Sequence, residues 1–463
     1  MLERLDDAPW AEIEHAYGTA EDVPDLLRAL LDPDEEVREE ALEELYGNVF
    51  HQGTRFPAAA YVVPFLIEMC ASPDVPDRGA LLRYWGSLIT GFFSVRERPT
   101  WGDGEQAYLD GGPVEADDDG CAEVLHRVYR ESLKGRGLLP DLLIDADPAV
   151  RAGAAWVVAC LPTVAGESVP ALTARLNVEP SEWVRAAIAF ALGELGAAGP
   201  LRRALAEEQS AAVRCMAACE LARIEPSDDL IEPLLRFVAE PIEGYANVPG
   251  AGGESAGDAA FAISLLSPDA RRAAIPALFD RLGRTRSFDT MPLVESILSA
   301  AFPPRPDRVE TLTDLQRDVL ARLVDVEEHW SIGNLHWVFE SRGLPSNRKA
   351  CARLVGVKVA RDEALDDLRF ALAHAEMGTG FFGKAREGIL KALEADPAVF
   401  ERAPASAESW LLCARAFAET EPDRALDAFR RAVAIDPAVA NRIERTGPLM
   451  DLLKKEGDDL PPS

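Results

Sequence analysis

The polar residues best placed to form a specific site lie together in one short segment, residues 46–57. Hydrogen-bonding side chains alternate there with aromatic ones, and the candidate binding residues are Asn48, His51, Gln52, Thr54 and Arg55. The segment is longer than a turn between two helices requires, and such loops on a rigid scaffold often carry function. The same side chains could instead satisfy backbone groups at neighbouring helix ends. The sequence supports a binding patch and a structural loop alike.

Other residues with useful chemistry do not stand in the arrangements that the chemistry requires. His329 and His336 follow two acidic residues, Glu327 and Glu328. A Gly-Asn pair separates the histidines, so we do not expect one helix face to offer both to a metal ion. The Gly-rich run at 244–257 lacks the preceding strand and the Gly-Lys-Ser/Thr end of a phosphate-binding loop. We also predict no strand–turn–helix elbow for a nucleophilic serine. We therefore predict no catalytic residue, no metal, no cofactor and no enzymatic activity.

A recurring phrase defines the elements that must position the polar segment. It consists of a Pro-Leu helix, an acidic turn and a Val-Arg pair that opens an Ala-rich helix, and its arginines are Arg38, Arg151, Arg185 and Arg214. Each helix pair carries an apolar stripe that it cannot bury alone, so neighbouring pairs must stack. The sequence therefore predicts an all-α fold, an α-solenoid in which antiparallel helix pairs form a right-handed superhelix.

An acidic residue stands six positions before each repeat arginine, giving the pairs Asp32–Arg38, Asp145–Arg151, Glu179–Arg185 and Glu208–Arg214. A guanidinium group matches a carboxylate with two parallel hydrogen bonds. We therefore predict a stacked ladder of structural ion pairs that ties one turn to the next. Phosphate binding by these arginines is disfavoured, because each has an acidic neighbour built into the phrase.

The repeated phrase resembles HEAT repeats, and more specifically the HEAT-like repeats of bacterial proteins, over about 23–90, 137–225 and more loosely 226–302. The Gly-Asn-x-x-His-Gln-Gly-Thr-Arg string also resembles a segment of bacterial HEAT-repeat proteins of ill-defined function. Some of those proteins look like components of toxin–immunity loci. Segments 383–397 and 422–437 look like the second helices of tetratricopeptide repeats, each closing in Asp-Pro. The resemblance implies helical-hairpin arrays and no established activity.

The predicted organisation has three regions. They are a HEAT-like solenoid over 1–302, a helical connecting region over 303–360 and tetratricopeptide-like hairpins over 361–463. A loop insertion at about 96–120 and a Gly-rich loop at about 241–257 interrupt the solenoid, and a helix is expected at about 121–134. We find no signal for a strand anywhere in the chain.

Composition bounds the partners. The chain has 79 acidic against 48 basic residues, a net charge of -31, which opposes binding to nucleic acid or to anionic membranes and favours basic partners. Seven scattered cysteines without a Cys-x-x-Cys pair fit a reducing compartment. No secretory signal or membrane-spanning run is apparent, and the abundance of Arg and Ala over Lys suggests a bacterial source. We therefore expect a cytoplasmic location.

The expected function is a non-catalytic protein-binding scaffold that uses an acidic solenoid surface. A more specific alternative is an immunity protein whose acidic face covers a basic toxin, for example a nuclease. A third interpretation is a lyase or hydrolase built on HEAT repeats. The sequence does not name the partner or the oligomeric state.

Overall fold

The structure is a computed structural model. It describes residues 1–51, 54–91, 96, 121–285, 289–303, 308–309, 311–326, 329–330, 332, 334–357, 389, 391, 407–418, 421–436 and 448–456. The chain divides into two compact units. Unit 1 comprises Met1–Thr285 and Pro292–Ala300, and unit 2 comprises Arg286–Met291 and Ala301–Ser463. The predicted division at residues 302 and 360 stays a prediction.

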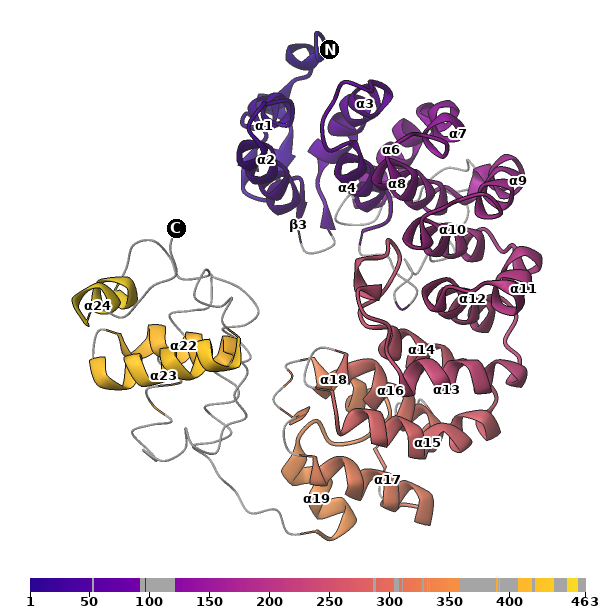
Figure 1. Cartoon of the computed structure of the whole chain (residues 1–463), viewed down its shortest axis with the longest axis vertical. Coiled ribbons are helices and arrows are strands. Elements are labelled where there is room, and N and C mark those ends of the chain that lie inside the picture. Colours follow the sequence, from indigo (N-terminus) through magenta and orange to yellow (C-terminus); the bar gives the residue numbers. More distant parts are fainter. Residues whose placement is uncertain are drawn as a thin grey trace. The chain divides into compact units, whose positions relative to one another are not determined.

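Unit 1 is built from helices that follow one another along the chain (Figure 1). They are α1 (Val23–Ala29), α2 (Glu35–Asn48), α3 (Pro57–Ala71), α4 (Arg78–Thr90), α6 (Cys121–Lys134), α7 (Leu139–Leu142), α8 (Pro148–Ala159), α9 (Ala165–Leu176), α10 (Glu182–Glu194), α11 (Ala198–Glu207), α12 (Ala211–Ile224), α13 (Ile231–Ala239), α14 (Ser255–Ser264), α15 (Pro268–Leu282) and α16 (Thr290–Ala301). The helix expected at about 121–134 is confirmed as α6.

The helices stack as pairs, as the repeated phrase predicts. The second helices α4, α8, α10, α12 and α14 pack one against the next in a continuous row. The first helices α7, α9, α11 and α13 each pack on the second helix of their own pair. The all-α solenoid is therefore confirmed, and the buried hydrophobic side chains lie between successive pairs.

Local sequence explains why these helices begin where they do and lie so close together. Helix α8 has Pro148 in its first turn, and the Asp147 side chain accepts a hydrogen bond from the Ala149 backbone N–H at 2.8 Å, which caps the helix. Small residues line the contact between α4 and α8. A Cβ added at Gly153 would lie 2.7 Å from the Leu82 Cβ, so the close approach requires glycine there.

Two short hairpins in unit 1 were not predicted. Strands β1 (Glu14–His15) and β2 (Gly18–Thr19) pair antiparallel, and β3 (Phe50–His51) and β4 (Thr54–Arg55) do the same. The expectation of no strand is wrong for these residues. Strands of two residues are too short to show the alternation of polar and apolar residues by which a strand is recognised. The second hairpin contains most of the candidate binding residues.

Unit 2 contains α17 (Asp314–Asp325), α18 (Leu335–Glu340), α19 (Arg348–Val355), α22 (Ala407–Phe417), α23 (Pro422–Ile435) and α24 (Pro448–Glu456). Helices α22 and α23 form a hairpin whose buried core includes Trp410, Phe417 and Phe429. The second helix expected over 422–437 is thus present as α23. Most of the other such segment, 383–397, lies outside the described residues, and the tetratricopeptide likeness stays a prediction.

Within the described part of the chain, no helix taken singly combines the length and the apolar character needed to cross a bilayer; α8 and the segment Pro162–Leu176 meet that test only together, and they are bent by 97° at their junction.

Candidate functional site

The repeat arginines form a ladder along the turns between first and second helices. We call the arginine ladder Arg38, Arg78, Arg151 and Arg185 together with the carboxylates that they contact. On one side three of the four phrase arginines bind their own turn: the Nη1 of Arg38, Arg151 and Arg185 donates at 2.8–2.9 Å to the backbone carbonyls of Asp32, Asp145 and Glu179. This bond satisfies carbonyls that the end of the first helix leaves exposed.

On the other side each ladder arginine contacts a carboxylate of the following turn. The contacts are Arg38–Asp77 at 2.6 Å, Arg78–Asp145 at 2.9 Å, Arg151–Glu179 at 2.7 and 2.8 Å, and Arg185–Glu208 at 3.3 Å. The predicted ladder is present, but the predicted partners are wrong. The acid six residues earlier offers its backbone carbonyl, and the stacking of pairs brings in the carboxylate of the next phrase.

Glu179 is the most tightly held carboxylate of the ladder. It accepts hydrogen bonds from Arg151, from Arg175 Nε at 2.7 Å and from the Ser181 backbone N–H at 2.9 Å, and its side chain is fully buried. Burial alone would raise the pKa of this carboxyl, but the three sets of hydrogen bonds outweigh it and lower the pKa to about 2. The hydrogen bond to Glu179 in turn raises the pKa of Arg151. This pair is therefore charged at all ordinary pH values.

The candidate binding residues lie at the end of α2, in and beside the second hairpin. Asn48 is buried, and its Nδ2 donates to Asp22 Oδ2 at 3.0 Å. Asp22 also accepts from His15 Nε2 at 2.9 Å, and the Asn48 carbonyl accepts from the Ala16 backbone N–H at 2.9 Å. Asn48 thus joins the two hairpins from within, which is the structural role that the sequence left open for it.

The other candidates are more accessible. His51 is half-buried, and its Nδ1 donates to the Gly47 carbonyl at 2.8 Å. Thr54 is exposed and Arg55 is half-buried, and they pair with His51 and Phe50 in the hairpin register. Gln52 lies outside the described residues. The structure therefore brings four of the five candidates together, and their role in binding stays a prediction.

Sequence reasoning missed a residue of this region, Tyr17. It is 72% exposed, its ring centroid lies 5.6 Å from that of His51, and the two rings meet edge to face at 76°. We define the hairpin patch as Tyr17, Asn48, His51, Thr54 and Arg55. Tyr17 lies 34 residues from His51 in sequence, so no local pattern could have joined them. The unusual exposure of a tyrosine was not visible without the first hairpin.

The Gly-rich segment lacks the geometry of a nucleophile elbow and the sequence of a phosphate-binding loop. It contains a Gly-x-Ser-x-Gly string over 253–257, which sequence reasoning overlooked, but Ser255 is fully buried at the start of α14. Its Oγ accepts a hydrogen bond from the Ile242 backbone N–H at 2.8 Å. No strand precedes this helix among the described residues, so the serine is not presented as a nucleophile elbow requires.

The same segment instead packs against the second helices and holds one residue of the insertion. A Cβ added at Gly250 would lie 2.3 Å from the Phe190 ring of α10, and φ at this glycine is +93°, so only glycine suits the position. Arg96 forms an ion pair with Asp258 and donates from Nη2 to the Glu254 carbonyl at 3.0 Å. Asp258 is fully buried, so this long-range pair fastens the end of the segment.

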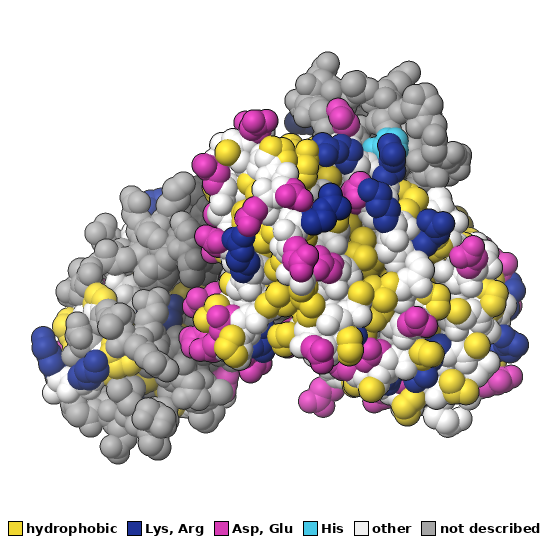
Figure 2. All heavy atoms as spheres, turned by 90° about the horizontal axis from the view of Figure 1, so that it is seen from above, with side chains coloured by type: hydrophobic (Ala, Val, Ile, Leu, Met, Phe, Trp, Pro, Cys, Tyr) yellow, Lys and Arg dark blue, Asp and Glu magenta, His cyan; other side chains and the backbone are white. Residues whose placement is uncertain are grey.

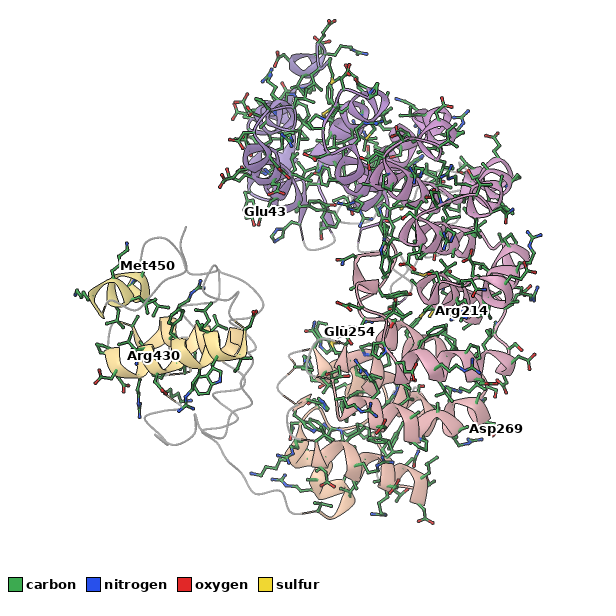
Figure 3. All side chains as sticks on the ribbon, viewed as in Figure 1. Glu43, Arg214, Glu254, Asp269, Arg430 and Met450 are labelled. Carbon is green, nitrogen blue, oxygen red and sulfur yellow. The ribbon has the colours of Figure 1, made fainter. Side chains whose placement is uncertain are left out.

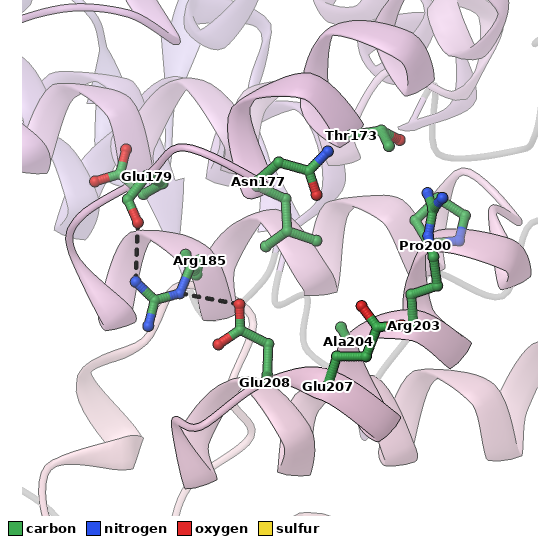
Figure 4. A pocket seen from close by; sticks show the side chains of 10 residues that line it. Thr173, Asn177, Glu179, Arg185, Pro200, Arg203, Ala204, Glu207 and Glu208 are labelled. Atoms are coloured by element: carbon green, nitrogen blue, oxygen red, sulfur yellow. Dashed lines mark hydrogen bonds and ion pairs between the residues drawn. The ribbon is translucent and has the colours of Figure 1, made fainter.

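A cavity of about 430 Å³ opens between the first helices α9 and α11 (Figure 4). Its polar lining includes Asn177, Arg203 and Glu207, and ladder residues Arg185 and Glu208 meet across its floor. The lining carries both signs of charge, so the cavity is a mixed polar groove.

Neither metal nor thiol chemistry is supported by the described side chains. Within the residues that the structure describes, no group of three or more His, Cys, Asp or Glu side chains is placed to hold a metal ion. His329 is buried, while Glu327 and Glu328 lie outside the described residues. The described cysteines are buried, and burial raises the pKa of Cys70 and of Cys351 to about 12, so these thiols stay protonated and unreactive.

The distribution of charge is uneven. On the face seen in Figure 2, acidic, basic and hydrophobic side chains are interspersed. Helix α2 differs, because six of its side chains are exposed glutamates: Glu35, Glu36, Glu39, Glu40, Glu43 and Glu44. Arg38, the single basic residue of this helix, is engaged by Asp77. The excess negative charge is thus concentrated on particular elements rather than spread evenly.

Comparison with protein-family models and with curated proteins finds no match. Among solved structures, the chain is similar to the complex of CpcE and CpcF of phycocyanin lyase from Nostoc sp., at 15% identity and a TM-score of 0.37, over 65% of this chain and 93% of that one. It is also similar to an engineered protein at 17% identity and a TM-score of 0.30, over 94% and 97% of the two chains. A structure from a study of the interaction between cadherin and beta-catenin is similar at 13% identity and a TM-score of 0.26, over 94% of this chain and 99% of that one. Likenesses this distant carry no statement about function.

Proposed function

We propose that the chain is a non-catalytic helical-repeat scaffold that binds a protein partner through an acidic surface, and that the partner is basic. The solenoid fold supports binding, since stacked helix pairs present an extended surface to a partner. The observation that carries the choice of partner is α2. Its six exposed glutamates recur at i and i+4 in two rows along one helix.

The glutamates beyond the first turn of α2, Glu39, Glu40, Glu43 and Glu44, are exposed and take no part in the buried face of the helix. The buried residues of α2 are Ala41, Leu45 and Asn48, and Tyr84 of α4 donates a hydrogen bond to the Leu45 carbonyl at 3.1 Å. Like charges at i and i+4 weaken a helix by a few tenths of a kcal/mol per pair. A basic partner would relieve this repulsion between glutamates. The negative field of the helix would also steer such a partner toward it. We infer that α2 contributes to the binding surface.

The same charge requirement applies to the immunity interpretation, in which the partner is a basic toxin. Identification of the captured protein separates the two: a toxin encoded beside this gene supports immunity, and any other basic protein supports a general scaffold. The proposal places the chain in a bacterial cytoplasm, in keeping with its residue usage and its buried, unpaired described cysteines.

The test is affinity capture from the source bacterium with the tagged full chain, followed by kinetics with the captured protein. The test variant changes Glu39, Glu40, Glu43 and Glu44 to Gln, which leaves the first turn of α2 intact. A matched control changes four exposed acids elsewhere in unit 1 to their amides: Asp141, Glu167, Asp229 and Glu240. Both variants alter net charge equally, so any difference between them reports location.

We expect the α2 variant to slow association about tenfold at low salt, and the control to stay within about twofold, because the field of nearby charges dominates the encounter. Association of the wild type should also slow as salt rises. Capture of an acidic protein or of nucleic acid, or equal behaviour of the two variants, would remove α2 and the basic partner from the proposed function.

A further inference from the structure

Tyr17 is the most exposed of the large hydrophobic side chains in the described residues of unit 1. A tyrosine ring presents a large rigid surface that can pack on a partner at a low entropic cost, and tyrosine is enriched among the residues that dominate binding energy at interfaces. The Tyr17 ring lies at the tip of the first hairpin and leaves most of its surface in solvent. The residues around Tyr17 indicate which kind of group it could bind.

The hairpin holds the Tyr17 backbone in place through buried polar groups. The Tyr17 N–H donates to His15 Nδ1 at 3.0 Å, and His15 Nε2 donates to Asp22 Oδ1 at 2.9 Å. His15 is buried, and the same Asp22 carboxylate holds Asn48. The tip is therefore fixed before a partner arrives, which lowers the entropy lost on binding.

The Tyr17 side chain is also supported. Its ring packs edge to face on His51, and its hydroxyl oxygen lies 3.4 Å from His51 Nδ1. His51 is in turn anchored by its hydrogen bond to the Gly47 carbonyl. The aromatic pair thus stands directly at the C-terminal end of α2, where the helix dipole favours a cation.

The electrostatic surroundings of the aromatic pair are acidic on the α2 side. Glu43, labelled in Figure 3, precedes Gly47 by one helical turn, and Glu44 precedes Asn48 by one turn. Both carboxylates are exposed, so the part of α2 just before its C-terminal turn is negatively charged. On the β4 side the charged residue is Arg55, and it is half-buried.

We propose that Tyr17 and His51 form the docking point for a basic side chain, an arginine or lysine of the partner protein, with Glu43 and Glu44 contributing its counter-charge. A cation over an aromatic ring beside carboxylates is a favourable arrangement, and arginine adds stacking to the charge. This inference rests on the proposed function, because it names the contact through which a basic partner is recognised.

The test uses synthetic peptides of alternating serine and arginine, with lysine and citrulline versions as comparisons, titrated into the full chain by calorimetry. Citrulline keeps the shape of arginine and removes its charge. We expect the arginine peptide to bind, the lysine peptide to bind more weakly and the citrulline peptide to lose at least tenfold. Equal binding of the citrulline peptide would overturn the inference.

Variants of Tyr17 separate the ring from its hydroxyl. Tyr17→Phe should bind the arginine peptide within about threefold of wild type, while Tyr17→Leu and Tyr17→Ala should lose at least fivefold. Trp337→Ala is the matched control, since Trp337 is an exposed aromatic residue of unit 2, and it should bind as wild type does. Melting curves of all variants should coincide with wild type, because these side chains bury little. Wild-type affinity in Tyr17→Ala would overturn the inference.

The inference and the proposed function fail in different ways. If the glutamine variant of α2 loses the captured protein while Tyr17→Ala keeps it, the docking point is wrong and the acidic scaffold stands. If the peptide requires Tyr17 but no basic protein is captured, the docking point stands and the proposed function falls.

Discussion

The arginine ladder predicts a graded series of stabilities, because its contacts repeat one geometry at different degrees of burial. The Arg151–Glu179 pair has exposed side-chain fractions of 7% and 0%, and Arg185–Glu208 has 18% and 22%. Arg28 offers a control, since it pairs on the surface with Asp6 and Asp25 outside the ladder. Replacing each arginine by alanine tests whether burial decides the contribution.

The structure sets the expected magnitudes. Arg151→Ala removes two hydrogen bonds to Glu179 and two to backbone carbonyls, and it leaves a buried carboxylate with less compensation. Breaking such a buried pair typically costs about 3–5 kcal/mol. Arg185→Ala removes one carbonyl bond at 2.8 Å and a looser carboxylate contact, for which about 1–2 kcal/mol is expected. Arg28→Ala should change stability the least of the three, because exposed ion pairs contribute little.

The assay is urea unfolding of the full chain, followed by circular dichroism and by tryptophan fluorescence. Tryptophans lie in both units, with Trp156 on α8 within the affected pairs and Trp410 on α22, so both probes report on the whole chain. Coincidence of the two transitions decides whether a single free energy of unfolding applies. Hydrogen exchange then locates the loss, which should be greatest in α8, α9 and α10.

A double variant separates charge from packing. In Arg151→Met the Glu179 carboxylate loses its main partner, whereas Arg151→Met with Glu179→Met removes both charges. We expect the double variant to be more stable than the single one, because the uncompensated buried charge is gone. Two results would refute the reasoning: equal stability of Arg151→Ala and Arg28→Ala, or a wild-type melting curve for Arg151→Ala combined with loss of partner binding. The second would make the ladder arginines ligands.

Three further predictions follow from single contacts. The pKa of Glu179 in the folded chain is lowered from 4.5 to about 2. The contribution of its charge to the free energy of unfolding is therefore present in full above about pH 4.5 and is lost as the pH falls toward 2. The difference in unfolding free energy between wild type and Glu179→Gln should shrink over that window. Gly86→Ala should destabilise by several kcal/mol, since the added Cβ would lie 2.1 Å from Trp156 Nε1, whereas Gly199→Ala, with no atom within 4 Å, should be neutral or slightly stabilising in a thermal melt. Arg96→Ala takes the guanidinium away from the buried Asp258 and should lower the melting temperature and expose the segment after α13 to limited proteolysis; unchanged cleavage would show that the pair does not fasten it.

Much of the solenoid was predictable because its determinants are local. The Asp-Pro turns, the capping residues and the Ala-rich second helices each act within a few residues, and α8 begins at Pro148 as the phrase predicts. What could not be predicted depends on contacts between distant segments. The ladder partners shift by one repeat because stacking, and not spacing along the chain, decides which carboxylate meets Arg151. Arg96 and Asp258 are 162 residues apart, and no pattern links them.

The candidate site also combines features that depend on local sequence with features that depend on contacts between distant segments. Its polar segment was visible as a local excess of hydrogen-bonding groups, but the two roles within it depend on tertiary contacts. Asn48 turns inward because Asp22, which lies 26 residues away, and the first hairpin satisfy its amide. His51 stays accessible because only its Nδ1 side is used by Gly47. Sequence alone could name the segment, whereas distinguishing the buried Asn48 from the more accessible His51 required the first hairpin.

The ladder also separates the exposed glutamates of α2 from the carboxylates that the turns engage. Carboxylates in the turns, such as Asp145 and Glu179, form ion pairs with arginines of the preceding repeat and accept hydrogen bonds from backbone N–H groups. They add to the net charge but offer no unengaged oxygen pair to a ligand. The glutamates of α2 lie outside the turn positions. The one basic residue of the helix, Arg38, forms an ion pair with Asp77. Because many carboxylates are already engaged, the net charge of -31 overstates the attraction of the whole surface for cations. It also does not show that this attraction is local. A partner selected by this chain should be recognised by where its basic residues lie, opposite α2 and Tyr17, more than by how many it has.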